Sequence, residues 1–247
     1  FAKPLNIILN HMSTTNVSGN YLVKNDISYN FTENDFYIGQ NYKDNVYIHS
    51  KFDAEKLILE EEYKGLNANI FRLGNLMARY SDGTFQKNKY DNAYFSRLLA
   101  LAKLGYLPYT LEQQKLEFSP IDETSEAIIK LLTIPNIKNN IFHIFSDKLI
   151  DINLLLDIFK SMNCICKFTD YDNFMQKLNL QKNEKILKYL VSDLTYSKKF
   201  DYTSNIIINQ NLTNKFFDLV DFKWSKIDEN YLIQFFNKVN FFKDIQE

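Results

Sequence analysis

The sequence is poor in cysteine, histidine, glycine and proline. Its 247 residues include 2 Cys, 3 His, 6 Gly and 4 Pro. Cys164 and Cys166 are too close along the chain for a good disulfide, and none of the histidines has the spacing of metal ligands. This composition argues against a disulfide-stabilised fold and against a metal site. We interpret both thiols as core or half-buried side chains.

The sequence also lacks an excess of charge of either sign and long apolar runs. It has 29 Lys+Arg against 30 Asp+Glu, a formal net charge of -1. Such a balance gives no global field that would attract nucleic acid or an anionic membrane. No apolar run approaches the roughly 20 residues that cross a bilayer, and we recognise no signal peptide. We therefore expect a cytoplasmic protein without nucleic-acid or membrane partners.

What the sequence does contain, near its start, is a pattern of strand, helix and strand. LNIILNHMS (5–13) is a near-continuous apolar run, typical of a strand that is covered on both faces. Residues 41–64 have a helical pattern, and Gly65 is a suitable residue to end that helix. NANIFRL (67–73) and NIFHIFS (140–146) read as further buried strands. These elements predict an α/β fold with a parallel sheet.

The rest of the chain favours helices. AYFSRLLALAKLG (93–105) predicts an amphipathic helix that ends at Gly105, and Asp122 is placed to cap a helix that stops before Pro135. After residue 149, segments such as INLLLDIFKSM alternate with polar turns, and no strand–helix repeat is evident. We expect this last part to form a second, mostly helical lobe.

Tyr47 and Lys51 are four residues apart near the start of the first predicted helix, so they share one face. That spacing alone does not distinguish a catalytic pair from a solvated helix face. Thr14 follows the first strand and the RLGN segment (72–75) follows the second, at the sheet edge where parallel sheets bind ligands. An ammonium lowers the pKa of a nearby phenol, and a hydroxyl can hydrogen-bond a developing oxyanion. The combination favours a catalytic site.

Several segments resemble one known family. HMSTTNVSG (11–19), YIHSK (47–51) and FRLGNLMARYSDGTFQKN (71–88) are together similar to extended short-chain dehydrogenase/reductases. More narrowly, they resemble the thioester reductase domains that terminate nonribosomal peptide synthetases. The similarity continues through NAYFSRLLALAKLGYLP (92–108) and EFSPIDETSEAIIKLL (117–132) and covers nearly the whole chain. It implies a Rossmann-like parallel sheet together with a helical substrate lobe.

The resemblance also implies roles for individual residues. The family's catalytic threonine, tyrosine and lysine fall on Thr14, Tyr47 and Lys51, and the last two also contact the cofactor. The segment that lies against the nicotinamide falls on Leu73, Gly74 and Asn75. Arg79 and Gln86 either line the entrance for the substrate arm or stabilise their own loop. Arg72 is interpreted as a structural ion-pairing residue at the end of its strand.

The reaction that the resemblance implies is the reductive release of a peptidyl or acyl thioester. NADPH delivers a hydride to a thioester held on the phosphopantetheine arm of a peptidyl carrier protein. Thr14 and Tyr47 stabilise the oxyanion, and Tyr47 supplies the proton. The hemithioacetal then collapses to an aldehyde, which some members of the family reduce further to an alcohol.

One part of the family's pattern is absent. Its members begin with a strand and a Gly-rich turn that holds the cofactor pyrophosphate, but the 6 Gly here never form such a motif. We therefore expect a partial Rossmann-like sheet that lacks its N-terminal Gly-rich half. The chain alone should bind NADPH weakly and be inactive. Strand 5–13 should expose an apolar edge that pairs with the missing half or drives self-association.

The resemblance suggests two subdomains. Residues 1–81 and 119–148 would form the partial dinucleotide-binding subdomain, and residues 82–118 and 149–247 a helical subdomain that faces substrate and carrier. Two other functions remain open. One is an extended dehydrogenase for a nucleotide sugar or an acyl-CoA, although NLMARYSDGTFQKN argues against a sugar enzyme. The other is a non-catalytic fragment that docks a carrier protein.

Overall fold

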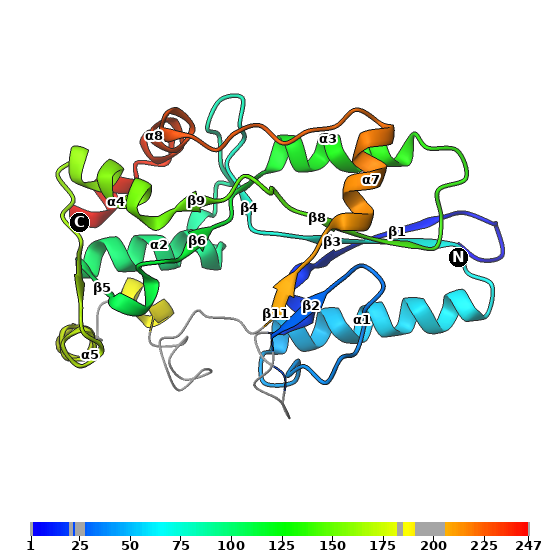
Figure 1. Cartoon of the computed structure of the whole chain (residues 1–247), viewed down its shortest axis with the longest axis horizontal. Helices are drawn as coiled ribbons and strands as arrows, with labels where there is room; N and C mark the ends of the chain where they lie inside the picture. Colours follow the sequence, from blue (N-terminus) through cyan, green and yellow to red (C-terminus); the bar gives the residue numbers. More distant parts are fainter. Residues whose placement is uncertain (1, 20–21, 23–27, 182–184, 191–205, 247) are drawn as a thin grey trace. The chain divides into compact units, whose positions relative to one another are not determined.

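The computed structural model describes residues 2–19, 22, 28–181, 185–190 and 206–246 (Figure 1). Its contacts divide the chain into two compact units. The first, called here the sheet unit, comprises residues 1–76, 123–146 and 204–224. The second, called the helical unit, comprises residues 77–122, 147–203 and 225–247.

The sheet unit is built on three parallel strands in the order β1-β3-β8. They are β1 (Leu9–Thr14), β3 (Ala68–Leu73) and β8 (Asn140–Ile144). The register pairs Thr14 with Leu73 and Leu73 with Ile144, so all three strands end at one edge of the sheet. The connection from β1 through a helix to its parallel neighbour confirms the predicted α/β fold.

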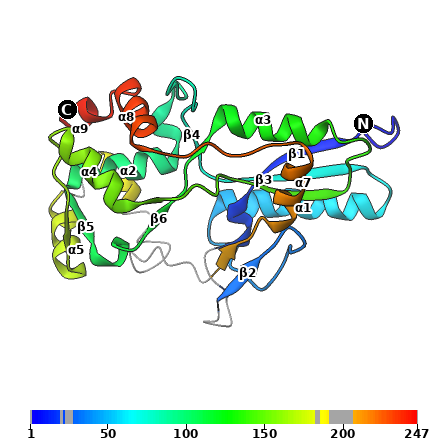
Figure 2. The same cartoon turned by 45° about the horizontal axis from the view of Figure 1, so that its top comes forward.

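Helices cover both faces of this sheet (Figures 1 and 2). α1 (Val46–Tyr63) lies on one face, and α3 (Ile121–Leu132) and α7 (Asn211–Leu219) lie on the other. Because side chains alternate along a strand, β3 contributes side chains to the apolar core on each face of the sheet. Ile70 packs with α1, and Phe71 packs with the helices of the opposite face.

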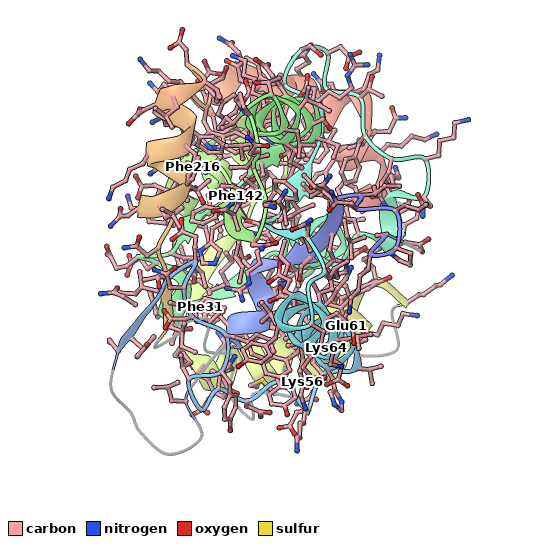
Figure 3. The ribbon with its side chains drawn as sticks, turned by 90° about the vertical axis from the view of Figure 1, so that its right-hand side faces the viewer. Phe31, Lys56, Glu61, Lys64, Phe142 and Phe216 are labelled. Atoms are coloured by element: carbon pink, nitrogen blue, oxygen red, sulfur yellow. The ribbon has the colours of Figure 1, made fainter. Side chains whose placement is uncertain are left out.

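Aromatic side chains fill the face covered by α3 and α7. Phe142 of β8 meets Phe216 of α7 edge-on, with ring centroids 5.3 Å apart, and Figure 3 shows the two rings together. On the outer surface of α1 the same view shows Lys56, Glu61 and Lys64. Lys64 pairs with Glu61 at 2.9 Å, so charged residues occupy the side of α1 that faces away from the sheet.

The first strand is shorter than its apolar run. The strand predicted over residues 5–13 begins only at Leu9, and residues 2–6 form a turn. Asn6 adopts a φ of 52°, and Ile7 donates its backbone N–H to Ala2 O at 3.0 Å. A residue in this left-handed conformation cannot continue a strand, and asparagine tolerates it better than most residues do.

The sheet unit also contains a segment that the sequence pattern placed in the helical lobe. β11 (Ile206–Ile208) pairs in parallel with β2 (Tyr29–Phe31), and α7 follows it directly. This segment is held in the sheet unit by apolar contacts between residues that are far apart in the sequence. Ile206 packs with Phe31 in one small core, and Phe217 of α7 joins the core of β3 and β8.

The helical unit consists of short helices around a core of leucine and aromatic side chains. Among its described residues the α-helices are α2 (Ala93–Leu104), α4 (Ile152–Ser161), α5 (Tyr171–Leu180), α8 (Glu229–Lys238) and α9 (Phe241–Gln246). Its strand pairs are β4 (Leu76–Met77) with β7 (Ser119–Pro120), β5 (Tyr106–Pro108) with β10 (Lys167–Thr169), and β6 (Lys115–Leu116) with β9 (Ile150–Asp151). Short 3-10 helices are η1 (Thr15–Ser18) in the sheet unit, and η2 (Lys89–Asp91), η3 (Tyr109–Leu111) and η4 (Lys185–Leu187) here.

The sequence predicted where one helix ends and where another begins. The structure confirms the first prediction and contradicts the second. α2 ends as expected, with Gly105 in the left-handed region at φ 72°. The prediction for Asp122 is wrong, because α3 already begins at Ile121 and Asp122 lies inside its first turn. Its carboxylate instead accepts hydrogen bonds from the backbone N–H groups of Tyr80 and Ser81, at 2.8 and 3.1 Å. Asp122 therefore holds the backbone of residues 80–81 at the start of α3.

No helix within the described ranges combines the length and the apolar character that crossing a bilayer requires.

Candidate functional site

The candidate site lies in the sheet unit, where β1 ends and α1 begins. Asn45 fixes the start of α1, because its side-chain oxygen accepts hydrogen bonds from the backbone N–H groups of Tyr47 and Ile48, at 2.9 and 3.2 Å. Tyr47 therefore stands in the first turn of the helix. Its side chain is 51% exposed, and among the described residues its phenol makes no hydrogen bond. The phenol is accessible to a ligand.

Lys51 connects the helix to the strand. It lies one turn after Tyr47 on the same face of α1, and its Nζ donates a hydrogen bond to the backbone oxygen of Met12 at 3.1 Å. Met12 is two residues before Thr14 on β1. An ammonium has three N–H donors, so one is used to hold the geometry and two are left for ligand oxygens.

Thr14 is the last residue of β1, and its side chain is buried. Its Oγ1 accepts a hydrogen bond from the backbone N–H of Asn16 at 3.2 Å and so caps η1. The hydroxyl hydrogen has no acceptor among the described residues, and it can be donated to a ligand oxygen. The side chains of Thr14 and Tyr47 do not bond to each other in the described structure. Lys51 joins the helix of Tyr47 to the strand of Thr14 through the backbone oxygen of Met12.

The loop after Thr14 requires a glycine. Gly19 has φ 68°, and a Cβ there would lie 2.7 Å from the backbone oxygen of Asn41. That distance is shorter than real Cβ contacts and faces rigid backbone, so only glycine fits. The segment just before α1 therefore packs directly on the loop that follows β1.

The predicted nicotinamide segment begins beside Thr14. Leu73 is the register partner of Thr14, and the Thr15 hydroxyl donates to Leu73 O at 3.3 Å. Gly74 continues the edge by donating its backbone N–H to Ile144 O at 3.0 Å. Asn75 follows directly. The structure thus places this segment at the same sheet edge as Thr14, and its contact with a cofactor stays a prediction.

Arg79 and Gln86 belong to the helical unit, and both are exposed. Arg79 pairs with Asp82 at 3.4 Å, and Gln86 donates to the backbone oxygen of Asn88 at 3.0 Å. These contacts lie within their own loop and agree with the loop-stabilising alternative. A role at the entrance for a substrate arm stays a prediction.

The sequence interpretation missed Glu55, which lies one turn after Lys51 on α1. Glu55 and Arg72 are both fully buried, and Arg72 binds the Glu55 carboxylate through Nε and Nη2, the latter at 2.8 Å. The Ser13 hydroxyl donates to the same carboxylate. The ion pair expected for Arg72 is therefore present, and it holds α1 against β1 and β3. The sequence signal that could have identified Glu55 is its place on the same face of α1 as the buried Phe52 and Ile58.

His143 completes this buried cluster from β8. Its Nε2 lies 3.2 Å from Arg72 Nη1 and its Nδ1 lies 2.6 Å from the backbone oxygen of Asn209. A guanidinium only donates, so Nε2 must be the acceptor and Nδ1 carries the hydrogen. Burial, followed by the nearby Arg72 charge, lowers the pKa of His143 to about 3. The ring is therefore neutral at physiological pH.

Because His143 is buried in its neutral form, we expect the free energy of unfolding to depend on pH. The ordinary pKa of histidine is 6.5 and the folded value is about 3, so between these pH values the unfolded chain binds the extra proton. We expect the free energy of unfolding to fall as pH drops below 6.5, by up to about 1.4 kcal/mol per pH unit. In His143→Asn that part of the slope should disappear. Urea unfolding at a series of pH values measures it.

The matched control for this measurement is His49→Asn, which removes an exposed histidine from α1. If His143→Asn keeps the acid slope of the unchanged protein, burial of the neutral ring is not its source.

The described residues contain no group of three or more His, Cys, Asp or Glu side chains arranged to hold a metal ion. The groups that the site does offer are a phenol, an ammonium, a threonine hydroxyl and backbone groups at the end of a parallel sheet. Such a set can hold a ligand through its oxygens, stabilise negative charge on a carbonyl oxygen and exchange a proton with it.

Comparison with known proteins gives related reductases. A family model described as "Male sterility protein", an NAD-binding family, matches residues 1–128. Glycine betaine reductase ATRR of Emericella nidulans is 31% identical over 98 residues, which are 40% of this chain and 7% of that protein. The chain thus matches a small part of a much longer curated enzyme.

Solved structures resemble nearly the whole chain. A thiolation-reductase di-domain from an archaeal non-ribosomal peptide synthetase is 29% identical, with a TM-score of 0.82, over 97% of this chain and 50% of that one. The reductase domain of the Aureusimine biosynthetic cluster is 24% identical, with a TM-score of 0.78, over 97% and 62%. The first match supports the predicted resemblance to terminal reductase domains, and the second shows the shared fold. The chain spans about half to two thirds of these relatives.

Proposed function

The chain belongs to the NAD-binding family described as male sterility protein, and from this premise we propose that it carries the catalytic groups of a thioester reductase. The substrate would be an acyl or peptidyl thioester tethered to a carrier protein, released as an aldehyde or an alcohol. The observation that supports this proposal is the Lys51–Met12 hydrogen bond. It holds the ammonium, one helical turn after the exposed Tyr47, against the strand that carries Thr14.

The residues present fit one end of a nicotinamide cofactor. Lys51 has two N–H donors left for ribose hydroxyls, and the edge formed by Leu73 and Gly74 offers a surface against which a nicotinamide ring could lie. The bound cofactor would supply the hydride, which no side chain can provide. A Gly-rich turn for the pyrophosphate is absent from the sequence. We therefore propose that the chain alone binds NADPH weakly and is inactive alone.

Thr14, Tyr47 and Lys51 would have separate roles in the reaction. The Thr14 hydroxyl and the Tyr47 phenol donate hydrogen bonds to the substrate carbonyl oxygen and stabilise the negative charge that develops there. Tyr47 then gives its proton to that oxygen. The positive charge of the Lys51 ammonium stabilises the phenolate that results.

Lys51→Met tests the proposal. The assay uses the full-length protein, meaning this chain joined to a segment that binds the cofactor pyrophosphate. It removes the ammonium but keeps much of the aliphatic stem, so the helix should persist while cofactor binding and proton transfer suffer. We expect kcat/KM for NADPH to fall about tenfold or more, the effect of losing one charge-assisted hydrogen bond. The readout is NADPH oxidation with a carrier-bound acyl thioester.

Lys56→Met, an exposed lysine on the same helix, should leave this rate unchanged. Equal rates in Lys51→Met and in the unchanged protein would count against the proposal. A protein that never oxidises NADPH with any carrier-bound thioester would favour the non-catalytic docking function instead.

A further inference from the structure

Gln40 connects the loop that follows β1 to the segment that leads into α1. The residue is buried, with 1% of its surface exposed. Its Nε2 donates hydrogen bonds to Val17 O of η1 at 3.0 Å and to Phe36 O at 2.8 Å. Its Oε1 accepts a hydrogen bond from the backbone N–H of Ile38 at 2.8 Å. The amide thus uses both of its N–H hydrogens and its oxygen to join two separate stretches of backbone.

The aliphatic part of Gln40 packs on the same loop. A Cβ built at Gly19 would lie 3.1 and 3.3 Å from Cβ and Cγ of Gln40, so the two residues are in close contact. The backbone of Gln40 also forms an antiparallel bridge with Leu22. Loss of the amide would leave the buried backbone oxygen of Val17 without this donor, which is unfavourable. Gln40 therefore holds the loop through its backbone and its side chain.

The two stretches that Gln40 joins lead to the two ends of the candidate site. On one side, Val17 belongs to η1, which Thr14 caps through its Oγ1. On the other side, the ring of Phe36 stacks on the ring of Phe52, with centroids 4.3 Å apart. Phe52 belongs to α1, the helix that carries the exposed phenol in its first turn. A chain of contacts therefore runs from the threonine, through the amide of Gln40, to that helix.

We propose that Gln40 is a positioning residue, which orients the Thr14 hydroxyl relative to the Tyr47 phenol so that both reach one substrate oxygen. This inference rests on the proposed function. Gln40 makes no hydrogen bond to either side chain in the described structure and acts through the loop that it holds. Lys51 has a separate anchor, the backbone oxygen of Met12, so cofactor binding should not depend on Gln40.

Gln40→Met keeps the length of the side chain and removes its three hydrogen bonds. In the full-length protein with a carrier-bound acyl thioester, we expect kcat to fall about 10- to 100-fold, because a misplacement of about 1 Å can cost that much. KM for NADPH should stay unchanged. Gln176→Met is the matched control, since Gln176 is exposed on α5 of the helical unit, and it should alter neither constant. An unchanged kcat in Gln40→Met would overturn the proposal.

Thr14→Val separates positioning from general support of the fold. Without the Thr14 hydroxyl, Gln40 has no group left to orient, so adding Gln40→Met to Thr14→Val should lower kcat by about threefold at most. An equal loss with and without the hydroxyl would contradict the proposal. Gln40→Asn, which shortens the side chain by one carbon and keeps the amide, is measured in parallel and should show the same dependence on Thr14.

Amide hydrogen exchange tests the same assignment without catalysis. The backbone N–H of Asn16 donates to Thr14 Oγ1, and in Gln40→Met its exchange should become about tenfold faster or more, while the amides of β3 keep their rates. Unchanged exchange at Asn16 in an active enzyme would refute the role of Gln40. If the reductase function is wrong, no variant oxidises NADPH, yet the change in exchange at Asn16 remains.

Discussion

Tyr47→Phe should lower kcat about 10²- to 10⁴-fold, the range typical for loss of a positioned general acid. The substitution removes one oxygen from an exposed side chain in the first turn of α1 and leaves the Asn45 cap intact, since that cap binds backbone N–H groups. Folding and the binding of the carrier protein should therefore be unchanged. The measurement is single-turnover NADPH oxidation with a carrier-bound acyl thioester in the full-length protein.

The same helix provides the control for this prediction. Tyr63 lies at the other end of α1 and is 97% exposed, so Tyr63→Phe removes the same oxygen where no chemistry is expected. A Tyr47→Phe enzyme that turns over at the rate of Tyr63→Phe would show that the phenol gives no proton. A large loss in kcat with unchanged carrier affinity would separate the catalytic function from the docking alternative.

Glu55→Gln should destabilise the fold by about 3–5 kcal/mol, the cost of leaving a buried charge without its partner. The amide keeps the shape of Glu55 but removes the negative charge that compensates Arg72, and both groups are fully buried. Arg72 also stacks over Phe31, with its guanidinium carbon 4.9 Å from the ring centroid, so it has little freedom to reach water. Urea unfolding measures the change in the free energy of unfolding.

Glu60→Gln on the same helix is the control for Glu55→Gln. Glu60 and Lys56 are exposed and 3.9 Å apart, and such surface pairs contribute about 0–1 kcal/mol. The double variant Glu55→Leu with Arg72→Met removes both charges together and should recover much of the lost stability. If Glu55→Gln unfolds at the same urea concentration as Glu60→Gln, the buried pair does not hold α1 in place.

Local patterns in the sequence were enough to predict the sheet. The apolar runs of β3 and β8 and the Gly105 end of α2 are signals contained within a few residues, and the structure confirms them. The start of β1 was mispredicted because Asn6 adopts a left-handed turn within an apolar run. Hydrophobicity carries no information about that backbone choice.

Contacts between residues far apart in the sequence could not be predicted from local patterns. β11 joins the sheet unit by pairing with β2, and its three isoleucines fit a helical lobe equally well when they are considered alone. Glu55 looked like one of many acids on a charged helix until Arg72 and Ser13 were seen to meet it. The spacing of Tyr47 and Lys51 was visible, whereas the anchor of Lys51 on Met12 depends on how α1 crosses β1.

The position of β1 at the end of the strand order has a practical consequence. β1 is paired with β3 on one side, and Leu9 and Met12 are 37% and 38% exposed. A chain break just before β1 therefore cuts no strand pairing described for this unit. We expect that a further strand, from another polypeptide or from a second copy of this chain, would pair with this edge.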